Sequence, residues 1–184
     1  AQVMMVATAS EPGTRAVDLP NTTVRGYLVK WLTDWVREYG VDGFRVDTVK
    51  HVEREFWRYF TQRVRQRLAK QGKTKFFMFG EAFDGNDALV GQFTKKDPPS
   101  PEELKQYADN KDPGPTITGD QLDSAFYFPQ HYQGFRNVML DAGSTQVLAD
   151  LWAQKTTNYG TEPPAQSAGI PPYKVLVNFI DNHD

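Results

Sequence analysis

The chain has 184 residues, of which 39% are hydrophobic, 13% aromatic and 24% charged, and it contains no cysteine. This composition is typical of a globular chain with a core, and it excludes disulfides and thiolate metal sites. The net charge of −2 provides no basic surface for nucleic acid or an anionic membrane. No segment approaches the roughly 20 apolar residues of a membrane span, and we expect no signal peptide at residues 1–7, which lack a basic start.

The first predicted helix covers residues 21–39, with Asn21 as its N-cap and Gly40 as its end. Its apolar residues recur at alternating steps of three and one, which predicts one buried stripe. The stripe consists of Val24, Tyr27, Leu28, Trp31, Leu32, Trp35, Val36 and Tyr39. A short apolar run at 43–46 then predicts a strand that leads into Asp47.

A second helix follows, with apolar residues in steps of four, and ends at Gln71-Gly72. These residues are Val52, Phe56, Phe60, Val64 and Leu68. Three arginines, Arg63, Arg65 and Arg67, predict a solvated basic outer side. The apolar run at 75–80 predicts the next strand, which leads into Glu81.

Residues 84–120 are rich in Gly and Pro and are too long for a simple connection. Within them, Ser100-Pro101 predicts the start of one short helix, because Pro is favoured at the first helical position. We weigh two interpretations evenly: an insertion tolerated at the surface, or a loop of a substrate cleft.

The last part predicts a strand at 125–128, a helix at 144–155 and a strand at 175–180. In the helix, Val147, Leu148, Leu151 and Trp152 lie on one side. Strands that alternate with helices predict an α/β fold with parallel strands. A complete (β/α)8 TIM barrel needs eight strands and about 250 residues. We therefore interpret residues 1–184 as one partial catalytic barrel domain, truncated at both ends, with an insertion at about 84–120.

Three carboxylic acids follow the predicted strands: Asp47, Glu81 and Asp184. Parallel strands place such residues on one face, where barrel enzymes do their chemistry. Neighbouring strands lie about 4.8 Å apart, which suits the roughly 5–5.5 Å between the two carboxyl groups of a retaining glycosidase. Arg45, two residues before Asp47, points to the same face of its strand and favours an ionised nucleophile. The pattern indicates acid/base or nucleophilic chemistry on an uncharged, oxygen-rich substrate.

Three segments support a family resemblance, namely residues 43–51 (GFRVDTVKH), 79–83 (FGEAF) and 179–184 (FIDNHD). In this order they resemble signature segments of the alpha-amylase family of glycoside hydrolases. The resemblance covers the whole chain, from the loop before the fourth barrel strand to the end of the seventh. It implies that Asp47 is the nucleophile, Glu81 the general acid/base and Asp184 the stabiliser of the transition state.

The resemblance implies further roles for flanking residues. Arg45 and His183 match positions that contact the catalytic carboxylate and the sugar. Lys50 and His51 match a pair typical of true alpha-amylases, on the leaving-group side. In many relatives the backbone oxygen at the His51 position also binds a structural calcium, which makes calcium the implied cofactor.

The sequence also departs from the family pattern. The family's segment on the third strand, its eighth strand and the other calcium ligands have no match here. The remainder of the barrel is therefore required, and the family implies a secreted or periplasmic location.

Three functions stay open at this point. The first is retaining endo-hydrolysis of α-1,4-glucosidic bonds in starch or maltodextrins, which Lys50-His51 favours. The second is transglycosylation through the same covalent intermediate, and the third is a non-catalytic binding or assembly fragment, against which the three carboxylates argue. Taken singly, Asp47 is more typical of a helix cap, and His51 and His183 are more typical of structural histidines. The combination of segments favours catalysis.

Overall fold

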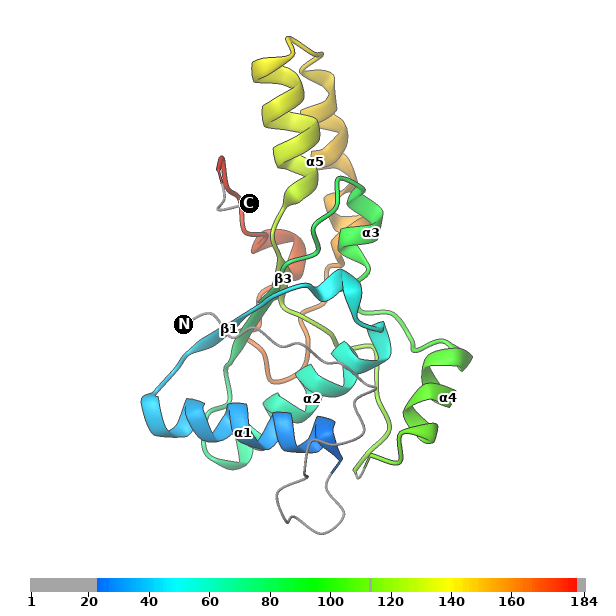
Figure 1. Cartoon of the computed structure of the whole chain (residues 1–184). Helices are drawn as coiled ribbons and strands as arrows, with labels where there is room; N and C mark the ends of the chain where they lie inside the picture. The colour runs from blue at the N-terminus through cyan, green and yellow to red at the C-terminus, as the bar shows by residue number, and fades with distance from the viewer. Residues whose placement is uncertain (1–22, 113, 182–184) are drawn as a thin grey trace.

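A three-stranded parallel sheet forms the centre of the computed structural model, which describes residues 23–112 and 114–181 (Figure 1). The strands are β1 (Gly43–Val46), β2 (Phe77–Gly80) and β3 (Ser124–Ala125), in the order β1-β2-β3. The helical elements are α1 (Val24–Tyr39), η1 (Val49–His51), α2 (Arg54–Lys70), α3 (Asp87–Gly91), α4 (Pro101–Asp109), η2 (Gln130–Leu140), α5 (Gln146–Tyr159) and η3 (Pro172–Lys174). The predicted parallel arrangement, with helices between the strands, is confirmed.

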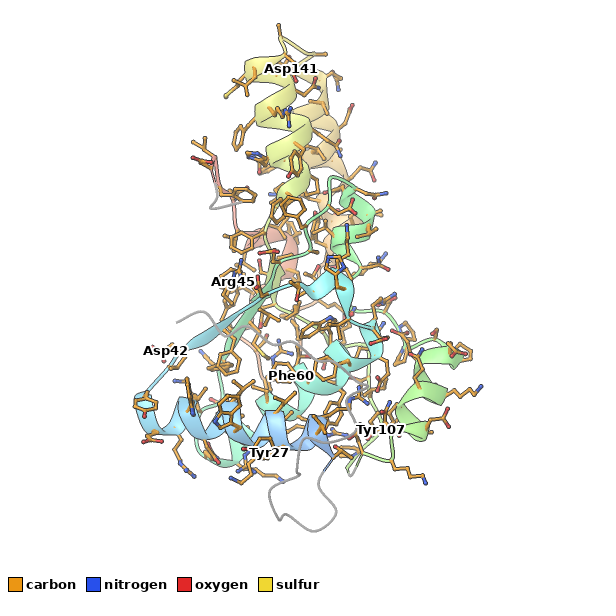
Figure 2. The ribbon with its side chains drawn as sticks, viewed as in Figure 1. Tyr27, Asp42, Arg45, Phe60, Tyr107 and Asp141 are labelled. Atoms are coloured by element: carbon orange, nitrogen blue, oxygen red, sulfur yellow. The ribbon has the colours of Figure 1, made fainter. Side chains whose placement is uncertain are left out.

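Helix α2 and the sheet share the main core. Val52 follows η1 and precedes α2, whereas the predicted steps of four are confirmed on α2 for Phe56, Phe60, Val64 and Leu68, which are all buried. They pack with alternate strand residues such as Phe44, Val46 and Met78. Figure 2 shows Phe60 on the helix side and Arg45 on the strand above it. Alternation along β1 therefore puts the apolar side chains in the core and leaves Arg45 on the other face of the sheet.

The prediction for α1 was correct for the helix but wrong for its cap and its burial. Asn21 lies outside the described residues, and the N-cap is Thr23, whose hydroxyl accepts a hydrogen bond from the Gly26 amide. Gly40 ends the helix in a left-handed conformation, as expected. The predicted stripe is only partly buried. Its exposed members are Val24, Tyr27, Trp31, Trp35 and Tyr39. Among the described elements α1 has its main contact with α2, and that contact covers only part of the apolar face of α1.

The prediction of a solvated outer side on α2 was wrong for Arg65, which is 2% exposed. Its guanidinium donates to the Asp123 carboxylate at 2.7 Å and to the Gln121 carbonyl at 2.8 Å. Arg58, a residue without a predicted role, is also fully buried and bonded to Asp97 and Glu103. Helical periodicity does not reveal that a later segment, residues 92–123, covers this side of α2.

The Gly- and Pro-rich stretch at 84–120, which overlaps this covering segment, contains more structure than predicted. Two helices form between residues 84 and 120, α3 and α4, where the sequence predicted one. The predicted start at Ser100-Pro101 is correct, and Ser100 and Glu103 form a reciprocal capping box. The Gln62 side chain bonds to the backbone at Thr118 and Asp120. Much of this stretch is thus held against α2.

The C-terminal part differs most from the prediction. An eleven-residue π-helix, η2, precedes α5 and was not predicted. The two helices form a protruding hairpin (residues 130–159), with Asp141 at its tip in Figure 2. The predicted strand at 175–180 was wrong as a strand, since it reduces to one parallel bridge between Phe126 and Val177. In the described residues this segment pairs with a neighbour on one side only, and that neighbour, β3, has two residues.

Candidate active site

Asp47 and Glu81 lie side by side at the ends of β1 and β2. The strands pair in one register, from Gly43 with Phe77 to Val46 with Gly80. The same register places Asp47 beside Glu81, one residue beyond the ladder. The Glu81 amide donates to the Val46 carbonyl at 2.8 Å, and the Val49 amide donates to the Glu81 carbonyl at 2.8 Å. Pairing therefore continues past both strands and fixes the backbone that carries the two acids.

One guanidinium joins the two carboxylates. Arg45 donates from one terminal nitrogen to Asp47 and from the other to Glu81. The three side chains are largely buried, with exposures of 14% for Arg45, 22% for Asp47 and 10% for Glu81. The Arg45 guanidinium also lies 5.5 Å from the centre of the Phe126 ring. The two acids are therefore held close together, with a fixed cation between them.

The turn after Asp47 depends on a tight packing arrangement beneath it. Thr48 adopts a left-handed conformation, with φ of 52°, and turns the chain directly into η1. Val49 is fully buried, and its carbonyl accepts a hydrogen bond of 2.8 Å from the Trp57 indole of α2. A Cβ on Gly80 would lie 2.6 Å from a Val49 methyl carbon. Gly80 thus lets η1 pack closely against β2 and directs Glu81 toward Asp47.

Lys50 and His51, the predicted sugar contacts, lie in η1 but differ in their surroundings. Lys50 donates to the Phe83 carbonyl and to the Asp84 carboxylate, each at 2.9 Å. The Lys50 hydrogen bond, with a second from the Asn86 amide, holds the pKa of Asp84 below its usual value. His51 is exposed. Lys50 therefore ties the loop after β1 to the loop after β2.

Asp84 is a residue that the sequence interpretation missed. A signal was present, because Lys50 lies four residues past the end of β1 and Asp84 four residues past the end of β2. The loops that follow neighbouring parallel strands lie close together, and opposite charges in them can pair. That β1 and β2 are neighbours is known only once the strands are placed.

Aromatic side chains form a continuous cluster beside the carboxylates. Phe128 contacts Phe83, Tyr132 and Phe179, with ring centres 4.7, 6.1 and 4.9 Å apart. His131 stacks on Phe179 at 5.1 Å with an interplanar angle of 13°. Phe83 is 41% exposed and lies two residues after Glu81. The cluster provides flat, apolar ring faces next to the acids.

Two predicted site residues, His183 and Asp184, lie outside the described residues. The structure therefore places three members of the predicted set together, namely Arg45, Asp47 and Glu81, with Lys50 and His51 on the adjoining turn. The roles given to them by the resemblance remain predictions.

The described residues do not form a calcium site by themselves. In the ranges 23–112 and 114–181, no three His, Asp or Glu side chains lie close enough to hold a metal ion. Calcium prefers six to eight oxygen ligands, and the predicted ligand here is the single backbone oxygen of His51. A calcium ion at His51 would therefore need further oxygen ligands from other parts of the protein.

Comparisons with known proteins match this arrangement to one family. Residues 13–102 match the model of the alpha amylase catalytic domain, a range that includes Arg45, Asp47 and Glu81. The chain is 30% identical over 161 residues to an alpha-amylase of Streptomyces lividans, covering 88% of this chain and 14% of that protein. These matches support the alpha-amylase family of glycoside hydrolases.

Further relatives agree with this assignment. A cyclomaltodextrinase of a Bacillus species is 27% identical over 96% of this chain and 24% of its own length. The crystal structure of an Anoxybacillus alpha-amylase matches 87% of this chain and 26% of its own, with a TM-score of 0.57 and 25% identity. An alpha-amylase from Geobacillus thermoleovorans, complexed with acarbose, matches the fold with a TM-score of 0.56 at 24% identity. The chain thus has the fold of part of an alpha-amylase TIM barrel and spans about a quarter or less of these relatives' lengths.

Proposed function

We propose that the protein carrying this chain hydrolyses α-1,4-glucosidic bonds in starch or maltodextrins with retention of configuration. The observation that supports this most directly is the in-register pair of Asp47 and Glu81, bridged by Arg45. Adjacent parallel strands are about 4.8 Å apart, and retaining glycosidases need two carboxyl groups separated by about 5–5.5 Å. Inverting enzymes need a wider separation to admit water.

The first step would form a covalent glycosyl-enzyme. An Asp47 carboxylate oxygen attacks the anomeric carbon as the bond from that carbon to the glycosidic oxygen breaks. Glu81 gives its proton to the departing oxygen, so the leaving sugar is neutral. Arg45 holds the Asp47 carboxylate in place for the attack. Asp184, by resemblance, stabilises the positive charge that develops on the ring.

The second step would release the sugar. Glu81, now ionised, takes a proton from water as the water oxygen attacks the anomeric carbon. The bond to Asp47 breaks, and both acids return to their starting states. When a sugar hydroxyl replaces this water, the same intermediate gives transglycosylation.

The binding residues follow from the same proposal. His183 contacts the sugar beside Asp47, and Lys50 and His51 contact the leaving-group side, where Lys50 also holds the loop at Asp84. The substrate is an uncharged α-glucan. Calcium, if bound, takes the His51 carbonyl and ligands from elsewhere in the protein.

A secreted or periplasmic location is part of the proposal. A 40% identical Escherichia coli relative is named a periplasmic alpha-amylase, although the match covers 38% of this chain. Within the described ranges, no helix combines the length and apolarity needed to cross a membrane.

The test measures reducing-sugar release from soluble starch by the protein that carries this chain. Glu81→Gln should lower the rate by about 10²–10⁴-fold, the usual contribution of a catalytic acid or base. Asp47→Asn, which removes the nucleophile, should lower the rate at least as much. Asp42→Asn is the matched control, because Asp42 precedes β1 at the opposite end and its side chain is 95% exposed. Equal rates for the unaltered protein and Glu81→Gln would refute the assignment. Product analysis from maltooligosaccharides separates hydrolysis from transglycosylation.

A further inference from the structure

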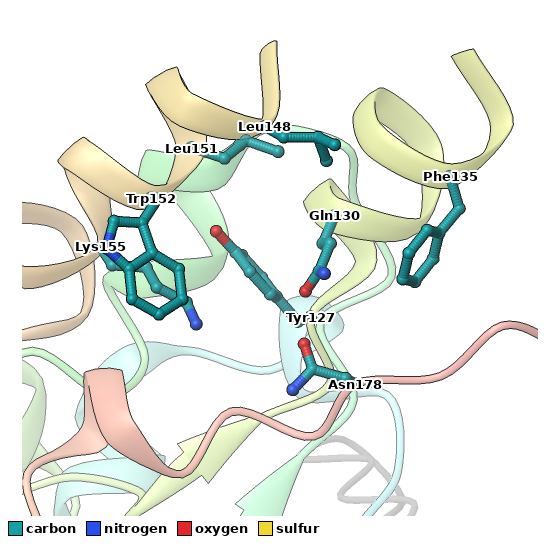
Figure 3. Close-up of a pocket in the computed structure, with 8 residues that line it drawn as sticks. All are labelled: Tyr127, Gln130, Phe135, Leu148, Leu151, Trp152, Lys155 and Asn178. Atoms are coloured by element: carbon teal, nitrogen blue, oxygen red, sulfur yellow. The ribbon is translucent and has the colours of Figure 1, made fainter. Parts of the chain in front are cut away.

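A pocket of about 340 Å³ lies between the two helices of the hairpin and the segment after η3 (Figure 3). Its lining residues are Tyr127, Gln130, Phe135, Leu148, Leu151, Trp152, Lys155 and Asn178. The volume falls within the usual range for small-molecule sites. None of these residues belongs to the proposed catalytic machinery.

The pocket lies on the opposite side of the chain from the carboxylates. Along the extended segment after β3, Phe126 contacts Arg45 and Phe128 joins the aromatic cluster. Tyr127, between them, points the other way and lines the pocket. In the segment after η3, Phe179 likewise packs on Phe128, while the preceding Asn178 lines the pocket. A ligand bound there would therefore not compete with a sugar held between Asp47 and Glu81.

The pocket combines an open aromatic surface with polar groups. Trp152 is 75% exposed, and the Lys155 ammonium lies 4.9 Å from its ring centre and 5.0 Å from that of Tyr127. Figure 3 shows the Tyr127 side chain extending between Gln130 and the α5 residues Leu151 and Trp152. Tyr127 is 2% exposed, yet its hydroxyl has no hydrogen-bond partner among the described residues. A buried hydroxyl without a partner carries a desolvation cost that a polar ligand would relieve.

The charge and shape of the pocket favour a neutral polyol. The described residues that line it include no carboxylate and one cation, Lys155. The Gln130 and Asn178 amides supply both donors and acceptors, while Phe135, Leu148 and Leu151 are apolar. A pyranose ring has this same division, with an apolar C–H face that stacks on an aromatic ring and hydroxyls around its rim.

We propose that this pocket is a second carbohydrate site, in which Trp152 stacks on a glucose unit of an α-glucan chain and Gln130 and Asn178 bind its hydroxyls. The choice of glucan rests on the proposed function. The site would hold the glucan polymer to the protein while another part of the same glucan occupies the catalytic face.

The first test measures adsorption to insoluble starch granules. Glu81→Gln is used as the background so that the starch is not consumed, and Trp152→Ala is added to it. We expect about a tenfold weaker adsorption, the order of magnitude of one aromatic contact. Trp152→Phe should retain most of the adsorption. Trp35→Ala is the matched control, because Trp35 is also an exposed tryptophan but lies on α1, and it should leave adsorption unchanged.

The second test measures Tm and maltoheptaose binding by calorimetry in the same variants. The proposal predicts one fewer binding site for Trp152→Ala at an unchanged Tm. Equal adsorption for Trp152→Ala and the background would overturn it. So would a lower Tm with unchanged binding, which would show that Trp152 only packs against other parts of the protein.

The two proposals fail in distinguishable ways. Adsorption that depends on Trp152, in a protein whose starch hydrolysis does not depend on Glu81, would support the pocket and refute the catalytic proposal. Hydrolysis that depends on Glu81, with adsorption indifferent to Trp152, would do the reverse.

Discussion

Helices α1 and α2 are both amphipathic, but their apolar faces meet very different surroundings. On α2 even Arg58 and Arg65 are buried, whereas on α1 both Trp31 and Trp35 are 43% exposed. Within the described residues, α2 has large contacts with both α1 and α4, while α1 has its main contact with α2. The comparison teaches that periodicity predicts a face, while the number of neighbouring elements decides how much of that face is covered.

The buried Arg65 on α2 belongs to a hydrogen-bonded group that connects the core to the strands of the candidate site. Asp123 accepts from Arg65 and from the Met78 amide of β2, each at 2.7 Å. One carboxylate thus links α2, β2 and the approach to β3, directly behind the strands that carry Asp47 and Glu81. Substitutions in the covered and uncovered parts should therefore differ in their cost to the free energy of unfolding.

Removing the Asp123 carboxylate should have the largest effect. Asp123→Ala leaves Arg65 charged and buried without its partner, which should lower the free energy of unfolding by about 3–5 kcal/mol. Urea denaturation measures the change. The matched control is Asp42→Ala, since the exposed pair of Asp42 and Lys73 should contribute no more than about 1 kcal/mol. Similar losses of unfolding free energy in both variants would show that burial does not determine how much these ion pairs contribute to stability.

Adding one methyl group behind the site should have the next largest effect. In Gly80→Ala the new Cβ would lie 2.6 Å from a Val49 carbon and 2.7 Å from a Leu122 carbon. We expect a loss of about 1–3 kcal/mol and slower starch hydrolysis, because Glu81 would be displaced. Gly85→Ala is the control, since its Cβ would come no closer than 3.9 Å to its neighbour Tyr132. A stable and fully active Gly80→Ala variant would disprove the packing argument.

The capping box on α4 tests the segment that covers α2. Ser100→Ala removes the acceptor for the Glu103 amide at 3.1 Å and should cost about 1 kcal/mol of unfolding free energy. Ser100→Asp should restore most of it, because aspartate is an equally good cap. Thermal unfolding measures both. No difference between the alanine and aspartate variants would show that the cap is dispensable.

The Lys50–Asp84 link should give a small, pH-dependent effect. The pKa of Asp84 in the folded protein lies below its usual value of 3.8, first because of the Lys50 hydrogen bond. The stabilisation is therefore present above pH 3.8 and is lost as the pH falls through the lower, folded value. Both groups are partly exposed, so less than about 1 kcal/mol is expected. Asp84→Asn should make the free energy of unfolding less dependent on pH below about pH 4. An unchanged pH dependence would exclude a contribution from the Lys50–Asp84 pair.

A substitution on the uncovered face of α1 should have the smallest effect. Tyr39 is 68% exposed and contacts Trp35 at a ring distance of 6.0 Å. Tyr39→Ala should change the unfolding free energy of this chain by no more than about 0.5 kcal/mol. Phe60→Ala on α2 is the contrasting variant, with an expected loss of about 3–5 kcal/mol. A large loss for Tyr39→Ala would mean that this face of α1 is covered after all.

Local sequence signals predicted the elements in which nearby residues determine the structure. The apolar steps on α2, the capping box at Ser100 and the glycine end of α1 all depend on residues within one or two turns. The same holds for the short apolar runs before Asp47 and Glu81, and strand alternation correctly placed Arg45 beside Asp47. Local signals failed where a distant segment supplied the partner, as for the burial of Arg65 and the pairing of residues 175–180.

The positions of Asp47 and Glu81 after β1 and β2, with α2 between these strands, were determined by the sequence itself, because strand and helix periodicities are short-range properties. Only the tertiary structure decided that Arg45 bridges both acids, that Lys50 pairs with Asp84, and that Tyr127 and Trp152 enclose a pocket. Those contacts depend on strand register and on which element covers which face. Both are set by the packing of segments far apart in the chain, and no local pattern records them.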